Sequence, residues 1–182
     1  FVTLREYSGN SSFLRGLAQW QHKFSDNLIL NAGITSQIFT LNGKKTLEPR
    51  MGLKYSISKK QSVGLGAGLH SQMQPFYVYF ASVSENGKRA ETNRDLDFSR
   101  AAHGVVSYEH NLGGLLRLKT ELYYQYLYRV PVSKDIGHVS VLNLGADFTS
   151  PNIANLVSTG TGYNYGLEIT VEKFYEKGFY VL

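Results

Sequence analysis

The sequence predicts an all-β fold, an antiparallel up-and-down transmembrane β-barrel with about eight strands in this chain. Apolar and polar residues alternate along segments of ten or more residues, as they do in strands with one apolar and one wet face. These segments exceed the roughly five or six residues of strands in soluble domains and match the roughly nine to eleven of a tilted membrane-spanning strand. Short and long connections alternate, as in outer-membrane barrels with short periplasmic turns.

The composition agrees with this class and excludes several others. The 182 residues include 18 glycines, 13 tyrosines and no cysteine, which excludes a disulfide framework and thiol chemistry. The hydrophobic content is 42%, yet no run approaches the roughly 18 apolar residues of a membrane-spanning helix. The net charge is +5, but no run of Lys or Arg exceeds two residues. We therefore expect the cations to line loops and a wet interior, and we expect no nucleic-acid partner.

The clearest alternation lies in the hairpin of residues 47–73. Its first arm has apolar side chains at the odd positions from Leu47 to Ile57 and polar or small residues at the even positions. A polar turn at residues 59–61 follows, and the second arm alternates again from Ser62. At about 3.3 Å per residue each arm is roughly 35 Å long, which is enough to cross a membrane.

The other strands follow the same pattern along the chain. Residues 1–9 resemble the end of an earlier element, and the polar stretch at 81–97 predicts a long loop. A second excursion at 131–160 contains an apolar piece, residues 139–148, which we expect to fold over the barrel mouth as a small extra strand. The expected complete strands cover residues 12–24, 28–41, 47–58, 62–73, 98–110, 115–130 and 161–174, and an eighth begins at 179.

Aromatic residues gather near both ends of the expected strands. Such residues form belts at the two membrane interfaces of outer-membrane barrels. One belt is expected beside the short turns, and the other beside the long loops, where residues 76–80 also contribute aromatic side chains. The proposed belt residues are Trp20, Tyr55 and Tyr108 near the turns, and Tyr124, Tyr126 and Tyr165 near the loops.

The polar face of the strands carries charges, which cannot face lipid cheaply. In a small closed barrel these side chains would pair and fill the interior, whereas in a large barrel they would face a channel or a plug. Glycines at 64, 66 and 68 fill little volume and favour room for an occupant. The candidate residues facing the lumen or plug are Glu48, Arg50, Lys54, His70, Gln72, His103, Arg117, Lys119, Glu121, Glu168 and Glu172.

No motif in the sequence predicts catalysis. Glu48 and Arg50 lie two residues apart on one face and are interpreted as a lumenal salt bridge rather than an acid/base pair. His70 and His103 could approach each other, but two histidines without a matched Cys or carboxylate make a weak metal site. The glycine-rich residues 64–68 lie inside a strand and do not open a helix, so they do not match the dinucleotide fingerprint. We expect no enzyme activity, no metal and no cofactor.

Several short motifs, in this order, resemble one protein family. They are the run LEPRMGLKY at 47–55, His70-Ser71-Gln72 with Pro75 and Tyr77, the tyrosine-rich run 123–128 followed by Val130-Pro131-Val132, and GYNYGLE at 162–168. Together they resemble the later barrel strands of TonB-dependent outer-membrane receptors, most nearly the Bacteroidetes type with a carboxypeptidase-regulatory-like N-terminal module. The resemblance implies a 22-stranded barrel, an N-terminal plug domain and a TonB box.

These features predict that residues 1–182 are one segment of such a barrel in the bacterial outer membrane, from its C-terminal part and incomplete at both ends. The whole receptor would import a scarce nutrient (an iron chelate, cobalamin, a glycan or a peptide). Its expected partners are outer-membrane lipid, its own N-terminal plug, TonB and an unknown small ligand. The alternative is a self-contained eight-stranded outer-membrane barrel with a structural or adhesion role. A barrel enzyme is a third, weaker interpretation.

Overall fold

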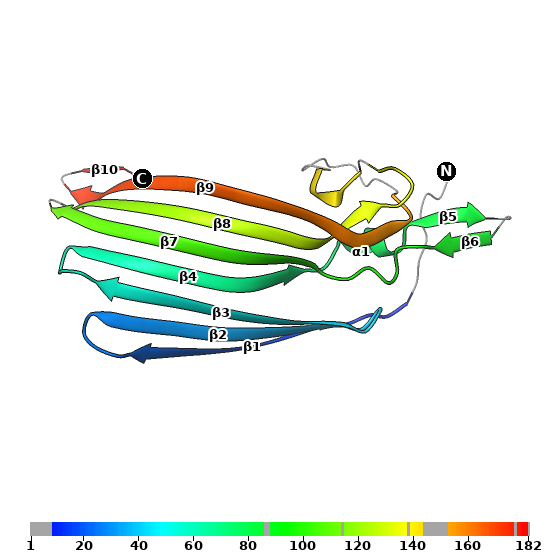
Figure 1. The fold of residues 1–182 in the computed structure, drawn as a ribbon, viewed down its shortest axis with the longest axis horizontal. Helices are drawn as coiled ribbons and strands as arrows, with labels where there is room; N and C mark the ends of the chain where they lie inside the picture. Colours follow the sequence, from blue (N-terminus) through cyan, green and yellow to red (C-terminus); the bar gives the residue numbers. More distant parts are fainter. Residues whose placement is uncertain are drawn as a thin grey trace.

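The computed structural model describes residues 9–85, 88–113, 115–137, 139–143, 153–176 and 178–181, and most of them belong to one antiparallel sheet (Figure 1). The described part of the sheet has eight strands, and each pairs with its neighbour in the order β1-β2-β3-β4-β7-β8-β9-β10. Their bounds are β1 Phe13–Lys23, β2 Leu28–Phe39, β3 Lys44–Ser56, β4 Gln61–Gln72, β7 Ser99–Gly113, β8 Leu116–Ser133, β9 Leu156–Glu176 and β10 Phe179–Val181. The short turns lie at one end of the strands and the longer connections at the other.

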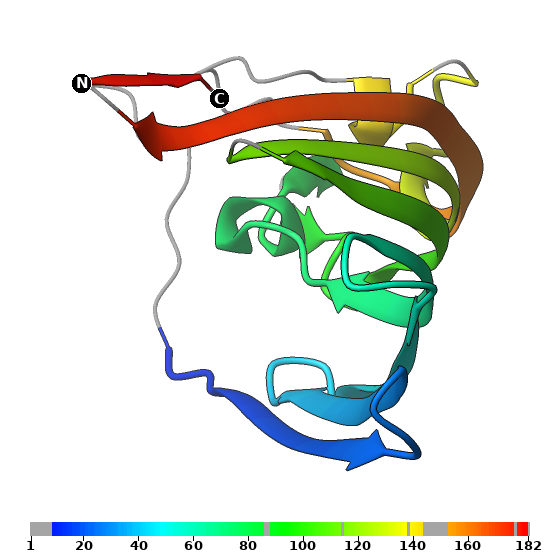
Figure 2. The same ribbon diagram turned by 90° about the vertical axis from the view of Figure 1, so that its left-hand side faces the viewer.

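The sheet curves without closing in the described part of the chain (Figure 2). No pairing joins β1 to β10 among the described residues. Apolar side chains occupy the convex face, where Leu65, Leu122 and Leu167 are 56%, 58% and 62% exposed. The polar residues of each strand face the concave side. Side chains alternate along every strand, and the register pairs polar positions of one strand with polar or small positions of the next.

The strands are staggered along the sheet. One cross-strand row on the convex face runs from Trp20 on β1 to Tyr165 on β9. Trp20 lies about five residues before the turn that follows β1, whereas Tyr165 lies about twelve residues before the turn that follows β9. Over the strands between them, the register therefore shifts by about one residue per strand. With about 3.3 Å per residue and about 4.8 Å between strands, this shift corresponds to a tilt of about 37°. Strands of outer-membrane barrels are tilted by roughly 35–45°.

A long connection lies between β4 and β7, as predicted, but it is folded and partly buried, which the prediction of a polar loop at 81–97 missed. It contains α1 (Phe76–Tyr79) and the hairpin of β5 (Ser82–Glu85) and β6 (Lys88–Glu91). In Figure 2, α1 lies on the concave side of the sheet. Tyr79, Leu96 and Phe98 are at most 4% exposed and pack with Phe39 and Leu156. Tyr79 therefore belongs to this core and not to a surface belt, and Phe80 packs against it.

The connection between β8 and β9 also differs from the prediction. Strand β8 continues to Ser133 and β9 begins at Leu156, so the connection is shorter than 131–160. Pro131 is accommodated where the register is irregular, a place where a missing N–H is tolerated. Within the expected extra strand at 139–148, Ser140 makes one isolated bridge to Val132 and η1 (Val141–Asn143) follows, while 144–148 lie outside the described residues.

The helices in the described residues are too short and not apolar enough to cross a membrane.

Candidate functional site

The concave face of the sheet is the candidate site, because the register places every residue of the predicted lumenal set on it. In β3, Glu48, Arg50 and Lys54 share this face, and the paired positions on β4, β7, β8 and β9 follow. The structure gathers the set into three groups along the strands rather than one centre. No comparison bears on a lumenal role for these residues, which stays a prediction.

The first group is an ionic network near the short turns. Lys54 Nζ lies 3.4 Å from Glu109 Oε2, and Arg117 Nη2 lies 3.0 Å from Glu109 Oε1. Arg117 Nη1 lies 3.0 Å from Glu172 Oε2, so the network joins β3, β7, β8 and β9. Glu109 is missing from the predicted lumenal set, although its parity with His103 on β7 was a sufficient signal. The network ties together strands far apart in the sequence and covers part of the polar face with paired charge.

Two further residues of the set pair along one strand. Lys119 Nζ lies 2.5 Å from Glu121 Oε2 on the concave face of β8. Glu168 on β9 accepts a hydrogen bond from Thr170 Oγ1 at 3.4 Å. Glu168 has no cationic partner within 4 Å among the residues that the structure describes.

The second group is a polar row at mid-sheet. The rings of His70 and His103 meet edge-on with centroids 4.7 Å apart. The Nε2 atoms of His103 and Gln125 are 2.8 Å apart, and Asn164 Nδ2 donates to Gln125 Oε1 at 2.8 Å. Gln72, at the end of β4, lines the same 370 Å³ hollow as the two histidines. Within the described part of the chain, no three His, Cys, Asp or Glu residues are grouped so that they could hold a metal ion.

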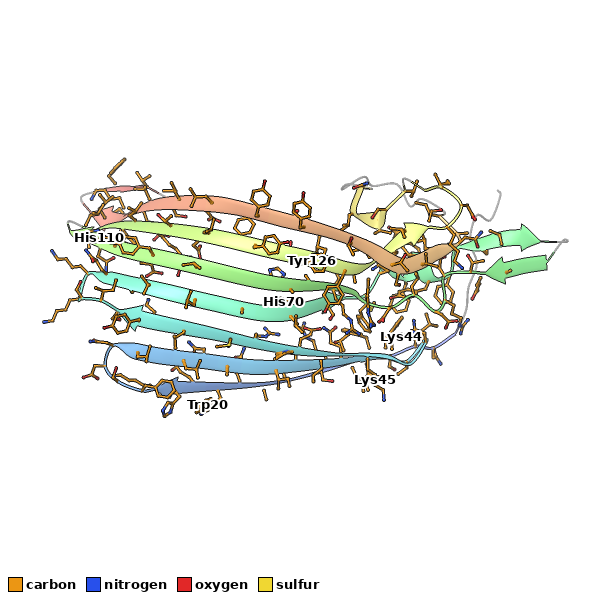
Figure 3. The ribbon with its side chains drawn as sticks, viewed as in Figure 1. Trp20, Lys44, Lys45, His70, His110 and Tyr126 are labelled. Carbon is orange, nitrogen blue, oxygen red and sulfur yellow. The ribbon has the colours of Figure 1, made fainter. Side chains whose placement is uncertain are left out.

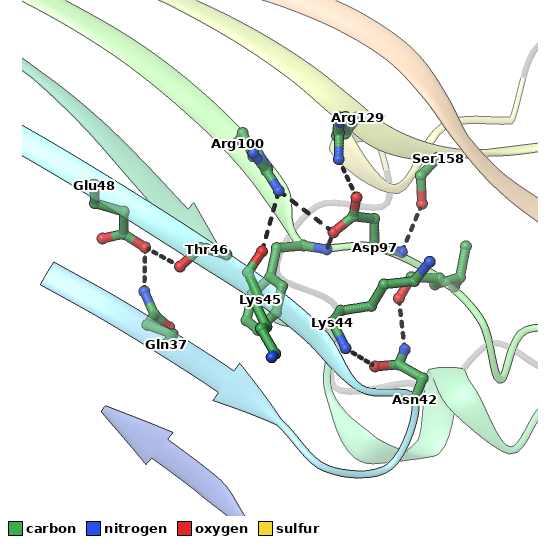
Figure 4. Close-up of polar contacts among 12 residues, drawn as sticks. Gln37, Asn42, Lys44, Lys45, Thr46, Glu48, Asp97, Arg100, Arg129 and Ser158 are labelled. Atoms are coloured by element: carbon green, nitrogen blue, oxygen red, sulfur yellow. Dashed lines mark hydrogen bonds and ion pairs between the residues drawn. The ribbon is translucent and has the colours of Figure 1, made fainter. Parts of the chain in front are cut away.

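The third group lies around Glu48 and Arg50, and the predicted salt bridge between them is wrong. Glu48 is 2% exposed and accepts hydrogen bonds from Gln37 Nε2 and from Thr46 Oγ1, the latter at 3.0 Å (Figure 4). Arg50 Nη2 donates to Thr35 Oγ1 at 2.5 Å. No ion pair forms between Glu48 and Arg50, both of which are described. Each side chain bonds to uncharged polar groups instead, Glu48 to Gln37 and Thr46, and Arg50 to Thr35 on the neighbouring strand.

The long-loop end of the concave face is closed by side-chain bonds between loops. Asn93 is 1% exposed, and its Nδ2 donates to Val78 O at 3.0 Å and Ile153 O at 2.7 Å. Its Oδ1 accepts from the Leu156 N–H at 2.9 Å. Asn93 therefore joins the 74–98 connection to the start of β9. Burial raises the pKa of the Tyr79 phenol, which accepts a hydrogen bond from the Gln74 N–H.

Charged residues surround this closed end. Asp97 lies between Arg129, whose Nη1 donates to it, and Arg100, whose Nη2 is 3.8 Å away (Figure 4). Arg129 has a φ of 55° and sits at an irregularity of β8, which turns its side chain out of the regular alternation. Lys44 and Lys45 lie at the same end of the strands (Figure 3). The sequence pattern does not single out these residues, because loop packing brings them together.

The predicted belt aromatics all lie on the convex face. Trp20 lies toward the short-turn end, while Tyr126 lies nearer the long loops (Figure 3). With the tilt given above, Trp20 and Tyr165 differ in height by about 17 Å, compared with an apolar band of about 25 Å in outer-membrane barrels. Their interfacial position stays a prediction. The predicted belt residues on the convex face are Trp20, Tyr55, Tyr108, Tyr124, Tyr126 and Tyr165.

Comparisons with known proteins identify the fold. No family model matches the chain, and no curated protein matches it. Among solved structures, the chain is similar to the siderophore receptor PirA from Pseudomonas aeruginosa, with a TM-score of 0.67 and 11% sequence identity. The similarity covers 89% of this chain and 31% of that chain. The predicted all-β, antiparallel barrel fold is therefore confirmed, and this chain spans less than a third of that receptor.

Proposed function

We propose that this chain is a wall segment of a TonB-dependent receptor barrel in the bacterial outer membrane. The observation that carries the proposal is the two-faced, tilted sheet. Its convex face exposes Leu65, Leu122, Leu167 and their neighbours, while the concave face carries ionic and amide networks. Only a non-polar surround matches the first face, and only water or polar protein matches the second. The fold similarity to a siderophore receptor supports the same reading.

In the whole receptor this segment would have three roles. Its convex face contacts lipid, and its concave face contacts a plug domain formed by a preceding part of the protein. Its long-loop end, closed by Asn93 and the Tyr79 cluster, forms part of the outer mouth that meets the ligand. Energy from the proton-motive force would arrive through TonB bound to the plug side. The segment positions groups and catalyses nothing.

The nutrient class is an iron chelate, cobalamin, a glycan or a peptide. Uptake of a radiolabelled member of each class is measured in cells with the gene intact, disrupted and restored, with and without a protonophore. We expect disruption and protonophore to abolish uptake of one class and restoration to recover it. Unchanged uptake of all four classes would contradict the transport function. An eight-stranded structural barrel would instead give a gene product of about this length with heat-modifiable gel mobility.

A further inference from the structure

Arg50 stands apart from the other charges in the middle of the concave face. Its guanidinium carries five N–H donors. One of them bonds to Thr35, and Nε is buried without a hydrogen-bond partner. No carboxylate lies within 4 Å of Arg50 among the described residues, and the nearby carboxylate of Glu48 is held by Gln37 and Thr46. A half-buried cation with unused donors is costly unless an acceptor reaches it.

Two glycines fix where the Arg50 side chain lies. A Cβ at Gly33 on β2 would come within 3.3 Å of Arg50 Cγ, and a Cβ at Gly68 on β4 within 3.1 Å of Arg50 Cβ. Both glycines directly face Arg50 in the register. The stem of Arg50 therefore fills the space that side chains on the two neighbouring strands would need. The guanidinium is held in place by the sheet itself.

A hollow of about 610 Å³ opens beside Arg50 on the concave face. Its other polar lining comes from Gln19, Gln21 and Asn31, and Gly52 contributes to the floor. Gln21 Nε2 donates to Asn31 Oδ1 at 2.8 Å, which leaves further amide donors and acceptors free to bond with an incoming group. The hollow is far larger than a single ion and suits a polypeptide segment whose backbone bonds to amides.

Three other cations on the concave face have carboxylate partners, which Arg50 lacks. Arg117 contacts two carboxylates, and Lys54 and Lys119 contact one each. We propose that Arg50 binds a carboxylate, the side chain of an Asp or Glu on the polypeptide that fills the concave side. A planar guanidinium takes a carboxylate with two parallel hydrogen bonds. The inference rests on the proposed function, because it assigns the contact chemistry of the plug.

Cross-linking in the whole gene product in its native membrane identifies the partner. A photoreactive benzoylphenylalanine replaces Gln19, which lines the hollow, and in a separate variant Gln125, which faces the same side of the sheet. Mass spectrometry then maps the cross-linked peptides. We expect Gln19→benzoylphenylalanine to capture a segment that carries an Asp or Glu. If neither position captures any other segment, the proposed function itself fails.

Exchanging the charges of Arg50 and the captured acid tests the proposed bond between them. We expect Arg50→Gln to weaken retention of the captured segment by about ten-fold or more, as for loss of a charged hydrogen bond. Retention is measured by protease sensitivity of the captured segment in increasing urea. Weaker retention appears as a lower urea concentration at which the segment becomes sensitive. Exchanging the two charges, Arg50→Glu with the captured acid changed to Arg, should restore it. Capture of a segment without an acid, or no rescue by the exchange, overturns the Arg50 inference while the plug contact stands.

Discussion

Replacing Asn93 by Ala should release the connection that closes the long-loop end of the concave face. The change removes three hydrogen bonds, to Val78 O, Ile153 O and the Leu156 N–H, at 3.0, 2.7 and 2.9 Å. Asn93 is 1% exposed and its bonds are buried or part-buried, so water replaces it poorly when the three backbone groups lose their partner. At about 1 kcal/mol per bond, and more for each group left unsatisfied, local unfolding of the connection should become easier by about 3–4 kcal/mol.

Amide hydrogen exchange of the folded protein measures this release. We expect the Leu156 amide and the amides of α1 to exchange about 100-fold or more faster in Asn93→Ala, because each 1.4 kcal/mol is a factor of ten. Amides in the middle of β4 and β7 should keep their rates. Asn93→Asp retains the acceptor and loses the two donations, so its effect should be intermediate. Equal exchange at Leu156 in all three proteins would refute the role given to Asn93.

Three further predictions concern charge, backbone space and pH. Arg117→Ala should lower the free energy of unfolding by about 2–3 kcal/mol, since Glu172 loses its cationic partner and Glu109 keeps only Lys54. Lys23→Ala at an exposed pair should cost under about 0.5 kcal/mol, and urea unfolding of both variants checks the difference. Gly160→Ala should be destabilising by about 2 kcal/mol or more, because its Cβ would lie 2.8 Å from Val130 O. A Cβ at Gly104 meets nothing within 4 Å, so Gly104→Ala should be neutral, and thermal unfolding compares the two variants. Burial raises the pKa of Tyr79 above its ordinary 10.0. The stability that the neutral phenol contributes is therefore fully present below about pH 10 and is lost as pH rises toward the raised pKa. Tyr79→Phe should remove this part of the alkaline loss of stability, as measured by unfolding at different pH values.

The strands could be predicted because their signal is local. Alternation from Leu47 to Ile57 depends on a strand having two faces, and the register then aligned equal faces of all its neighbours. The same periodicity placed the concave residues, including the histidine pair and Arg117. Residue order alone therefore predicts which side chains share each face of the sheet.

The rest depended on contacts between distant residues. Asn93 and Leu96 lie in a stretch that is polar on average. Leu96 is core only because it packs with Phe39 and Leu156, and Asn93 is buried by its hydrogen bonds to three backbone groups. Tyr79 resembles a belt residue in sequence, but α1 turns it inward. The Glu48–Arg50 spacing suggested a pair, yet Gln37 and Thr35 on the neighbouring strand offered nearer partners. Partner choice between polar side chains across strands is not encoded in spacing along one strand.

The assignment of the two faces is tested most directly by spin-label accessibility in the native membrane. Because this segment has no cysteine, single cysteines can be placed at adjacent positions of β4, Leu65→Cys on the convex face and Gly66→Cys on the concave face. A Cβ at Gly66 has its nearest neighbour at 4.0 Å, so the label site is open. We predict that the nitroxide at 65 is relaxed mainly by oxygen and the one at 66 mainly by a water-soluble nickel chelate. Equal accessibility to the nickel chelate at both positions would contradict a membrane-spanning wall.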